Sequence, residues 1–141
     1  PVAKSAALEV PLVPAAVAPG KRGRVLVVDD EPSLGTALRR LLAPEHDVLA
    51  VASGRAAIDQ VSSGERFDVI FCDLMMPEMT GMELHAELLR LAPEQAARMI
   101  FMTGGAFTRR AREFLDQIRN PRIEKPFEMG SVRALIHGML Q

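Results

Sequence analysis

Short apolar runs alternate with amphipathic stretches from residue 24 to residue 140. The apolar runs predict strands, and three of them consist almost entirely of Val, Ile, Leu, Phe or Met, as in strands that are covered on both faces. The predicted strands are residues 25–28, 47–51, 68–72, 98–102 and 122–124. Strands that alternate with helical stretches are typical of a parallel sheet with helices packed on it.

The stretches between the strands have the apolar spacing of helices with one buried face. Pro32 begins the first helix, at a position where a missing amide proton is tolerated. Gly64 ends the second, the third stops before Pro93, and Thr108 is a candidate cap for the fourth. The predicted helices cover residues 32–42, 55–63, 81–91, 108–118 and 132–140. The uninterrupted alternation predicts an α/β fold.

A linker, or the tail of a preceding domain, is predicted for residues 1–23, which are rich in Ala, Val and Pro. Residues 7–12 form a candidate short strand within it. The remaining residues, 24–141, have the size of one globular domain with one core.

Composition narrows the classes of function. The formal net charge is −1, so no excess of positive charge favours direct binding to nucleic acid. The apolar stretches are shorter than the roughly 20 residues that span a bilayer, and the start lacks the pattern of a signal peptide. We therefore expect no membrane contact in this segment and a cytoplasmic location. Cys72, the single cysteine, lies in an apolar run and is expected to be buried.

Polar side chains stand at the ends of four predicted strands. Asp29 and Asp30 follow the first strand, Asp73 the third, Thr103 the fourth and Lys125 the fifth. Ligands of open parallel sheets bind beyond the carboxyl ends of the strands. We therefore expect these five side chains to share one pocket.

Carboxylates that converge repel one another unless a cation neutralises them. Mg²⁺ fits best, because it binds through a few carboxylates together with phosphate oxygens. Lys125 and the hydroxyl of Thr103 are suited to phosphoryl oxygens. The set lacks a His or Cys cluster for zinc and a glycine-rich loop for a nucleotide.

Each residue also has a plain structural interpretation. Asp29 and Asp30 could cap a helix, Thr103 could be a turn residue, and Lys125 could lie in an exposed loop. A carboxylate such as Asp73 at the end of a buried strand needs polar partners. The joint occurrence of these residues at four strand ends favours a functional site.

Residues 24–140 resemble the receiver domain of response regulators and hybrid sensor kinases. The matching segments are residues 25–31, residues 68–77 with Gly81 following, residues 102–104 and residues 124–127. The resemblance implies a doubly wound (βα)5 flavodoxin-like fold, a three-layer sandwich around a parallel five-stranded sheet of order 2-1-3-4-5.

The resemblance also implies a role for each site residue. Asp73 would accept a phosphoryl group, and Thr103 and Lys125 would hold the phosphoryl oxygens. The metal ligands would be Asp29, Asp30, Asp73 and the backbone carbonyl of Met75, with Asp29 acting mainly through metal-bound water. The peptide bond between Lys125 and Pro126 would be cis.

The implied partner is a histidine kinase or a histidine phosphotransfer domain, and the segment would be a signalling module rather than an enzyme. The face formed by the fourth helix, fifth strand and fifth helix would be the partner surface, as is usual in the family, and a homodimer through this face is one candidate arrangement. The two candidate contexts are the C-terminal receiver of a hybrid histidine kinase and a stand-alone regulator.

Three positions depart from the family or bear on its regulation. Arg122 occupies the switch position, where the family often has an aromatic residue. Met75 and Gly105 occupy variable positions near the acceptor, and neither offers a polar side chain that could orient water. We therefore expect slow self-dephosphorylation.

Two other classes of function stay open. One is a Mg²⁺-dependent phosphotransferase of the haloacid dehalogenase type, which would need a second carboxylate where Met75 stands. The other is a docking module that works without phosphate.

Overall fold

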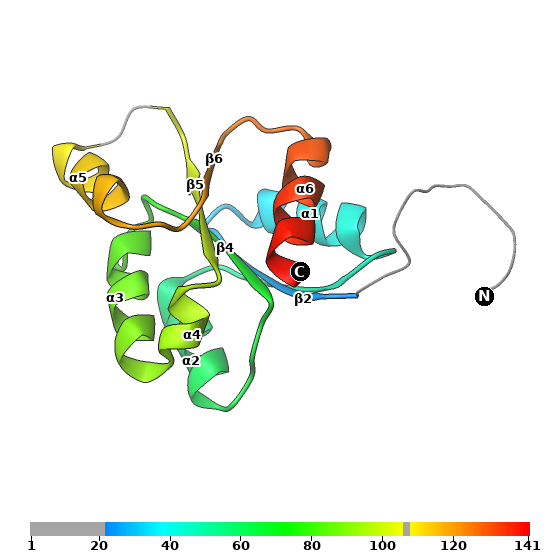
Figure 1. Cartoon of the computed structure of the whole chain (residues 1–141), viewed down its shortest axis with the longest axis horizontal. Coiled ribbons are helices and arrows are strands. Elements are labelled where there is room, and N and C mark those ends of the chain that lie inside the picture. The colour runs from blue at the N-terminus through cyan, green and yellow to red at the C-terminus, as the bar shows by residue number, and fades with distance from the viewer. Residues whose placement is uncertain (1–21, 106–107) are drawn as a thin grey trace, which may run out of the picture.

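The computed structural model describes residues 22–105 and 108–141, which form a parallel sheet with helices on both faces (Figure 1). The strands are β2 (Arg24–Val28), β3 (Asp47–Val51), β4 (Val69–Asp73), β5 (Met99–Thr103) and β6 (Arg122–Glu124). The helices are α1 (Pro32–Leu42), α2 (Gly54–Ser62), α3 (Gly81–Leu91), α4 (Pro93–Ala96), α5 (Arg109–Gln117) and α6 (Met129–Leu140). No helix among these residues is long and apolar enough to cross a membrane.

The sheet has five strands in the order β3-β2-β4-β5-β6, and all neighbours are parallel. In chain order this is 2-1-3-4-5, so the predicted topology is confirmed. The chain moves outward from β2 to β3 and then returns to the other side of β2 with β4. The carboxyl ends of β2 and β4 therefore flank the point where the strand order reverses, which is where such folds bind ligands.

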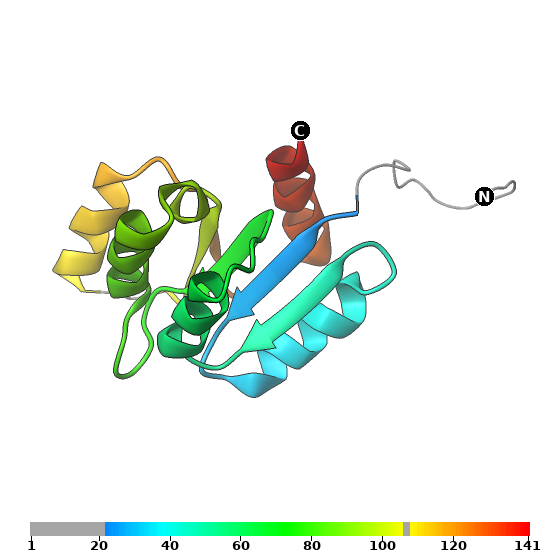
Figure 2. The same cartoon turned by 90° about the horizontal axis from the view of Figure 1, so that it is seen from below.

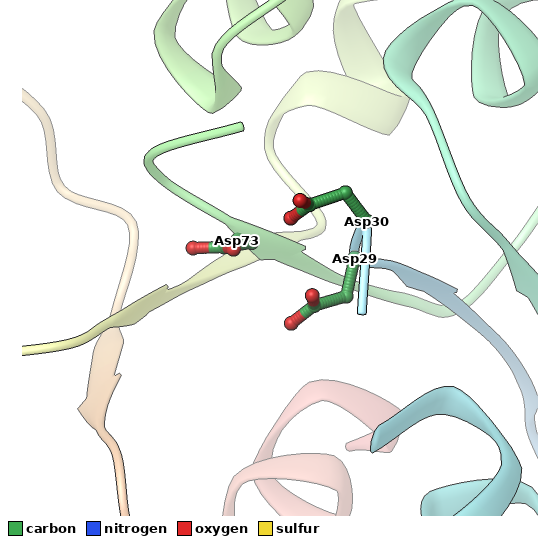
Figure 3. A group of neighbouring side chains, drawn as sticks. All are labelled: Asp29, Asp30 and Asp73. Carbon is green, nitrogen blue, oxygen red and sulfur yellow. The ribbon is translucent and has the colours of Figure 1, made fainter. Parts of the chain in front are cut away.

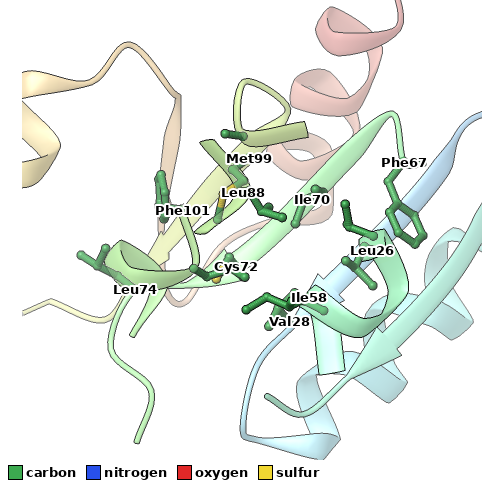
Figure 4. Close-up of a cluster of buried hydrophobic side chains, with 14 of the residues drawn as sticks. Leu26, Val28, Ile58, Phe67, Ile70, Cys72, Leu74, Leu88, Met99 and Phe101 are labelled. Carbon is green, nitrogen blue, oxygen red and sulfur yellow. The ribbon is translucent and has the colours of Figure 1, made fainter. Parts of the chain in front are cut away.

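Helices cover both faces of the sheet because the central strands are apolar on both faces. Figure 2 shows the two helical layers from a second direction. On one face, Leu26, Ile70 and Phe101 pack with buried side chains of α2, α3 and α5 (Figure 4). On the other face, Val27 and Phe71 pack with buried side chains of α1 and α6. Cys72 is buried in the first of these clusters, as predicted.

Side-chain caps fix where several helices begin. The hydroxyl of Ser53 accepts a hydrogen bond from the amide of Ala56 at the start of α2, and Thr108 caps α5 in the same way, as predicted. Thr80 and Glu83 form a reciprocal capping box at the start of α3. This cap fixes the end of the loop that follows β4, and so helps to position the loop next to Asp73.

Most element boundaries lie within a residue of the prediction. Strands β4 and β5 are shifted by one residue, so that Asp73 and Thr103 end their strands rather than follow them. The short helix α4 is not among the predicted helices, because in the sequence Pro93 indicates only where α3 ends; Pro is also well placed in the first turn of a new helix. The candidate strand at residues 7–12 and most of the predicted linker lie outside the described residues.

Candidate functional site

Three carboxylates meet at the carboxyl edge of the sheet. Asp29 and Asp30 follow β2, and Asp73 is the last residue of β4. Because β2 and β4 are parallel neighbours, with Val28 opposite Cys72, these residues reach the same edge. One oxygen from each carboxylate lies within 4.8 Å of the others (Figure 3). The predicted convergence of the three acidic residues is therefore observed.

The three carboxylates differ in their access to solvent. Asp29 is 3% exposed, whereas Asp30 is exposed. Asp73 lies between these extremes, with a side chain that is 14% exposed. The side chain of Asp73 is thus mostly buried but remains accessible to solvent.

Lys125 enters the site from the end of β6. Its Nζ atom lies 2.8 Å from Oδ2 of Asp29 and 3.6 Å from Oδ2 of Asp73. Its backbone amide donates a 2.7 Å hydrogen bond to the carbonyl of Thr103, which ties the end of β6 to the end of β5. The Lys125-Pro126 peptide is cis, as the resemblance implied. The amine thus lies beside two of the three carboxylates.

Backbone amides hold two of the carboxylates in place. Oδ1 of Asp29 accepts a 2.8 Å hydrogen bond from the amide of Glu31, and Oδ1 of Asp73 accepts a 3.3 Å bond from the amide of Met75. Helix α1 begins after Glu31, and no side chain caps it. The capping interpretation of the aspartate pair therefore does not hold.

Burial and charge act together on the ionisation of the site. Burial raises the pKa of the Asp73 carboxyl, and the nearby charges of Asp29 and Asp30 act in the same direction. The charge of Lys125 opposes this effect without cancelling it. Burial also acts to lower the pKa of Lys125, but its hydrogen bond to Asp29 and the charge of Asp73 raise it overall. The lysine is therefore a firmly charged ammonium.

Thr103 is 5% exposed and ends β5. Asp73 lies opposite Met102 in the register of β4 and β5, so Thr103 is one residue further toward the edge that holds the carboxylates. Its hydroxyl makes no hydrogen bond to any other part of residues 22–105 and 108–141. A buried hydroxyl without a partner is uncommon, and it leaves a donor available to a bound group.

Gly81 is a positioning residue to which the sequence alone assigned no role. A Cβ atom at this residue would lie 2.7 Å from the carbonyl oxygen of Asp73 and 3.0 Å from Cα of Leu74. The amide of Gly81 donates a 2.9 Å hydrogen bond to the carbonyl of Leu74. The start of α3 therefore packs directly on the backbone of Asp73, and only glycine allows that approach. In the sequence, the one feature that could have indicated this role is a glycine at the first position of a predicted helix.

The remaining predicted residues lie around the site. Met75 follows Asp73 by two residues, and its side chain is 41% exposed. Gly105 has a positive φ of 86°. Arg122 is exposed at the start of β6, opposite Phe101. Arg122 is therefore at the other end of β6 from Lys125.

The donor set fits a hard divalent cation. The cluster offers oxygen ligands alone, and in the part of the chain that the structure describes its ion pairs are those of Lys125 with Asp29 and Asp73. Mg²⁺ prefers such oxygen donors and needs few protein ligands. The acidic cluster therefore fits a divalent metal, and the hydroxyl of Thr103, at the end of β5, is a hydrogen-bond donor without a described partner.

Comparison with known proteins agrees with this geometry. The family described as the response regulator receiver domain matches residues 25–137. The transcriptional regulatory protein TcrA of Mycobacterium tuberculosis is 33% identical over 117 residues, which are 82% of this chain and 45% of that protein. The chain thus spans about half the length of this curated relative.

Two solved structures are similar over most of their length. A structure titled adenylate cyclase from Rhodopirellula baltica has a TM-score of 0.76 and 27% identity, covering 85% of this chain and 88% of that one. The signal receiver domain of a signal transduction histidine kinase from Syntrophus aciditrophicus has a TM-score of 0.71 and 26% identity, covering 84% and 89%. The chain belongs to the response regulator receiver domain family of two-component signalling. Receiver domains are signalling modules that interact with histidine kinases or phosphotransfer proteins.

Proposed function

We propose that this receiver accepts a phosphoryl group on Asp73 from a phosphohistidine of a histidine kinase or histidine phosphotransfer domain. One observation carries the proposal: Asp73 is the carboxylate that is both partly accessible and within 3.6 Å of the Lys125 amine. Asp29 is nearly fully buried, and Asp30 has no such cation beside it in the described structure. Asp73 thus combines access with charge neutralisation.

The proposed reaction is a transfer between two nucleophiles. A carboxylate oxygen of Asp73 forms a bond to phosphorus while the bond from phosphorus to the imidazole nitrogen of the donor breaks. The electron pair of that bond returns to the imidazole. Catalysis of phosphoryl transfer rests mainly on positioning and on charge stabilisation. The site supplies both through fixed backbone amides and the Lys125 ammonium.

Each site residue has a proposed part in this step. Mg²⁺, held by Asp29, Asp30, Asp73 and the carbonyl of Met75, supplies neutralising charge for the phosphoryl oxygens when it is bound. Lys125 holds one phosphoryl oxygen through its ammonium. The hydroxyl of Thr103, which lacks a described partner, donates to another. The negative charge of the phosphoryl group then attracts Lys125 and Thr103. Attraction of this kind is how phosphorylation shifts the conformation of the residues around a site.

The setting of the module is also proposed. We place it in the cytoplasm, and we keep two contexts: the receiver of a hybrid histidine kinase and a stand-alone regulator. A homodimer through α5, β6 and α6 stays a prediction from the family resemblance. The haloacid dehalogenase alternative is disfavoured, because Met75 occupies the position of the carboxylate it requires. The proposal treats the chain as a phosphoacceptor rather than an enzyme.

The proposal is tested by incubating the chain and an Asp73→Asn variant with acetyl phosphate and Mg²⁺, then measuring their intact masses. We expect one phosphoryl adduct on the unaltered chain and none on the variant. An Asp30→Asn variant serves as a partial control, because it keeps the acceptor and loses a metal ligand. An equal adduct on the Asp73→Asn variant would place the acceptor elsewhere. No adduct on either protein, with Mg²⁺ binding intact, would favour a docking module.

A further inference from the structure

Met75 carries the most accessible thioether of the chain. All eight methionines lie among the described residues, and Met75, which is 41% exposed, is the exposed one. Its neighbour Met76 is 5% exposed. The other six are buried or half-buried: Met79, Met82, Met99, Met102, Met129 and Met139. An oxidant in solution therefore reaches the sulfur of Met75 before the others.

Two other sulfur atoms close to the site are covered by the fold. Met79, in the same loop as Met75, packs against the start of α2, where a Cβ atom at Gly54 would lie 2.6 Å from Sδ of Met79. Cys72 is fully buried in the core. Met75 is thus the site's sulfur that is open to chemical modification.

Met75 also lies beside the proposed acceptor. Its amide donates a 3.3 Å hydrogen bond to Oδ1 of Asp73, which fixes the backbone of Met75 next to that carboxylate. The methionine side chain is unbranched and has three rotatable bonds, and at this residue the core does not enclose it. The sulfur of Met75 is therefore always within a side chain's length of the acceptor.

Oxidation changes what this side chain can do. A thioether is a weak hydrogen-bond acceptor, whereas methionine sulfoxide carries a polar oxygen. In the reaction with hydrogen peroxide, the lone pair of sulfur forms a bond to one peroxide oxygen while the bond between the two oxygens breaks. The sulfur is oxidised by two electrons, and the second oxygen leaves as water. Methionine sulfoxide reductases reverse the change.

We propose that Met75 is a redox-sensitive modification site that sets the lifetime of the phosphorylated state, with hydrogen peroxide or another hydroperoxide as the oxidant. The inference rests on the proposed function, because it concerns the phosphoryl group on Asp73. The thioether leaves the attacking water without a partner, and the phosphoryl group persists. The sulfoxide oxygen accepts a hydrogen bond from that water and holds it beside the phosphorus atom, so oxidation shortens the phosphorylated state.

The step that oxidation accelerates is hydrolysis. The water oxygen forms a bond to phosphorus while the bond from phosphorus to the carboxylate oxygen of Asp73 breaks. The electron pair of that bond returns to the carboxylate, and inorganic phosphate leaves. The proton of the water passes to solvent, since a sulfoxide is too weak a base to take it. The sulfoxide of Met75 therefore acts by orienting the water.

The first measurement needs no phosphoryl group. The chain is treated with limiting hydrogen peroxide, and peptide mapping by mass spectrometry follows the addition of one oxygen atom to each methionine. We expect Met75 to be oxidised well before Met76, which is adjacent in sequence and buried. Oxidation of Met76 ahead of Met75 would overturn the inference.

The second measurement compares phosphoryl lifetimes before and after oxidation. Peroxide is removed, the chain is labelled with acetyl phosphate and Mg²⁺, the donor is removed in turn, and intact mass follows the loss of the phosphoryl group. We expect several-fold faster loss when Met75 carries the added oxygen, and a return to slow loss after treatment with methionine sulfoxide reductases. An unchanged or longer half-life with Met75 fully oxidised would overturn the inference.

Two variants assign the effect to one residue. Met75→Leu keeps an apolar side chain and cannot be oxidised, so peroxide should no longer shorten its half-life. Each protein is compared with itself before and after peroxide, so an effect of the substitution on the starting half-life cancels. Met82→Leu is the matched control: it removes a half-buried methionine from the first turn of α3 and should keep the full response. A response that survives in Met75→Leu would overturn the assignment to Met75.

The inference and the proposed function fail in different ways. A chain that takes up no phosphoryl group before peroxide treatment overturns the proposed function, and the inference with it. A chain that is labelled on Asp73 and keeps its half-life after oxidation of Met75 overturns the inference alone.

Discussion

The ammonium of Lys125 is bound by Asp29, at 2.8 Å, and that carboxylate is almost completely buried. Each partner thus offsets the cost of burying the other. A buried charge that loses its counter-ion is expensive, whereas an exposed one is solvated by water. Removing either partner is therefore costly, and the pair keeps the amine at the site.

Replacing Lys125 by Met should destabilise the protein in EDTA by about 1–3 kcal/mol, because Asp29 is left buried without its charged hydrogen-bond donor. Mg²⁺ should recover part of this loss, since a cation again faces the carboxylate. Urea unfolding with and without Mg²⁺ measures both effects. Arg90→Met removes an exposed ion pair as the control and should cost less than about 1 kcal/mol. Equal losses for the two variants would contradict the prediction.

Asp73→Asn should stabilise the metal-free protein at pH 7. Burial raises the pKa of Asp73, so the folded state binds its proton more tightly than the unfolded state does. Stability therefore falls as pH rises from about 3.9 through the folded pKa, and the loss persists at neutral pH. Asparagine removes this loss, so we expect the variant to have a higher Tm than the unaltered protein in EDTA. Thermal unfolding between pH 4 and pH 7 should show the gain shrinking toward the acid end; a constant gain would contradict this account.

His85 should make the fold sensitive to mild acid. Its ring is 8% exposed and packs against Phe101 and Phe114. Burial lowers its pKa, although a hydrogen bond with Asn120 acts in the other direction. The unfolded state therefore binds the proton more tightly, and stability is lost as pH falls below about 6.5 toward the folded pKa.

A His85→Phe variant should lose less stability than the unaltered protein between pH 7.5 and pH 5.5, measured by urea unfolding in EDTA. The slope that remains should include His46, whose pKa burial also lowers. Identical slopes for the two proteins would show that His85 does not titrate in this range.

The aspartyl phosphate should be long-lived. Hydrolysis requires a water molecule aligned with phosphorus, and neither the thioether of Met75 nor Gly105 can orient one. We expect a half-life well beyond seconds in Mg²⁺ without a phosphatase, followed by intact mass over time. Met75→Asn should shorten it several-fold, because an amide can hold the water. A half-life of only seconds for the unaltered chain would refute the hypothesis.

Gly81→Ala should damage the acceptor site through the backbone. The added methyl would meet the Asp73 carbonyl at 2.7 Å, so the start of α3 must move away. We expect a loss of about 1–3 kcal/mol in stability and slower labelling by acetyl phosphate. Gly130→Ala is the control, since a Cβ there meets nothing within 4 Å. Equal behaviour of the two variants would show that the close approach is not needed.

Much of the fold could be predicted because its signals are local. Buried strands such as β4 and β5 are continuous apolar runs, and Pro32 and Thr108 mark helix starts. The set of candidate site residues followed from one rule, that parallel strands place their carboxyl ends at a common edge. Four strand ends with polar residues were enough to propose the pocket.

The finer relationships could not be predicted, because they depend on distances between segments far apart in the chain. Lys125 donates a hydrogen bond to Asp29, to which it lies closer than to Asp73, and Lys125 and Asp29 are 96 positions apart in the chain. The contact of Gly81 with the Asp73 backbone depends on the path of the intervening loop. Helix α4 was missed for a different reason, since one proline both ends α3 and begins a new turn. Sequence patterns thus predict which residues belong to the site, whereas the packing of the fold determines the distances between them.

The position of β6 at the edge of the sheet bears on when, during folding, the acceptor site is complete. Lys125 directly follows this strand, and among the described strands β6 pairs with β5 alone. A folding intermediate in which β2, β4 and β5 had assembled without β6 would hold all three acidic groups and lack the amine beside them. Such a species would repel an incoming anionic donor, so under the proposed function we expect chains in which β6 has not yet joined the sheet to be poor phosphoacceptors.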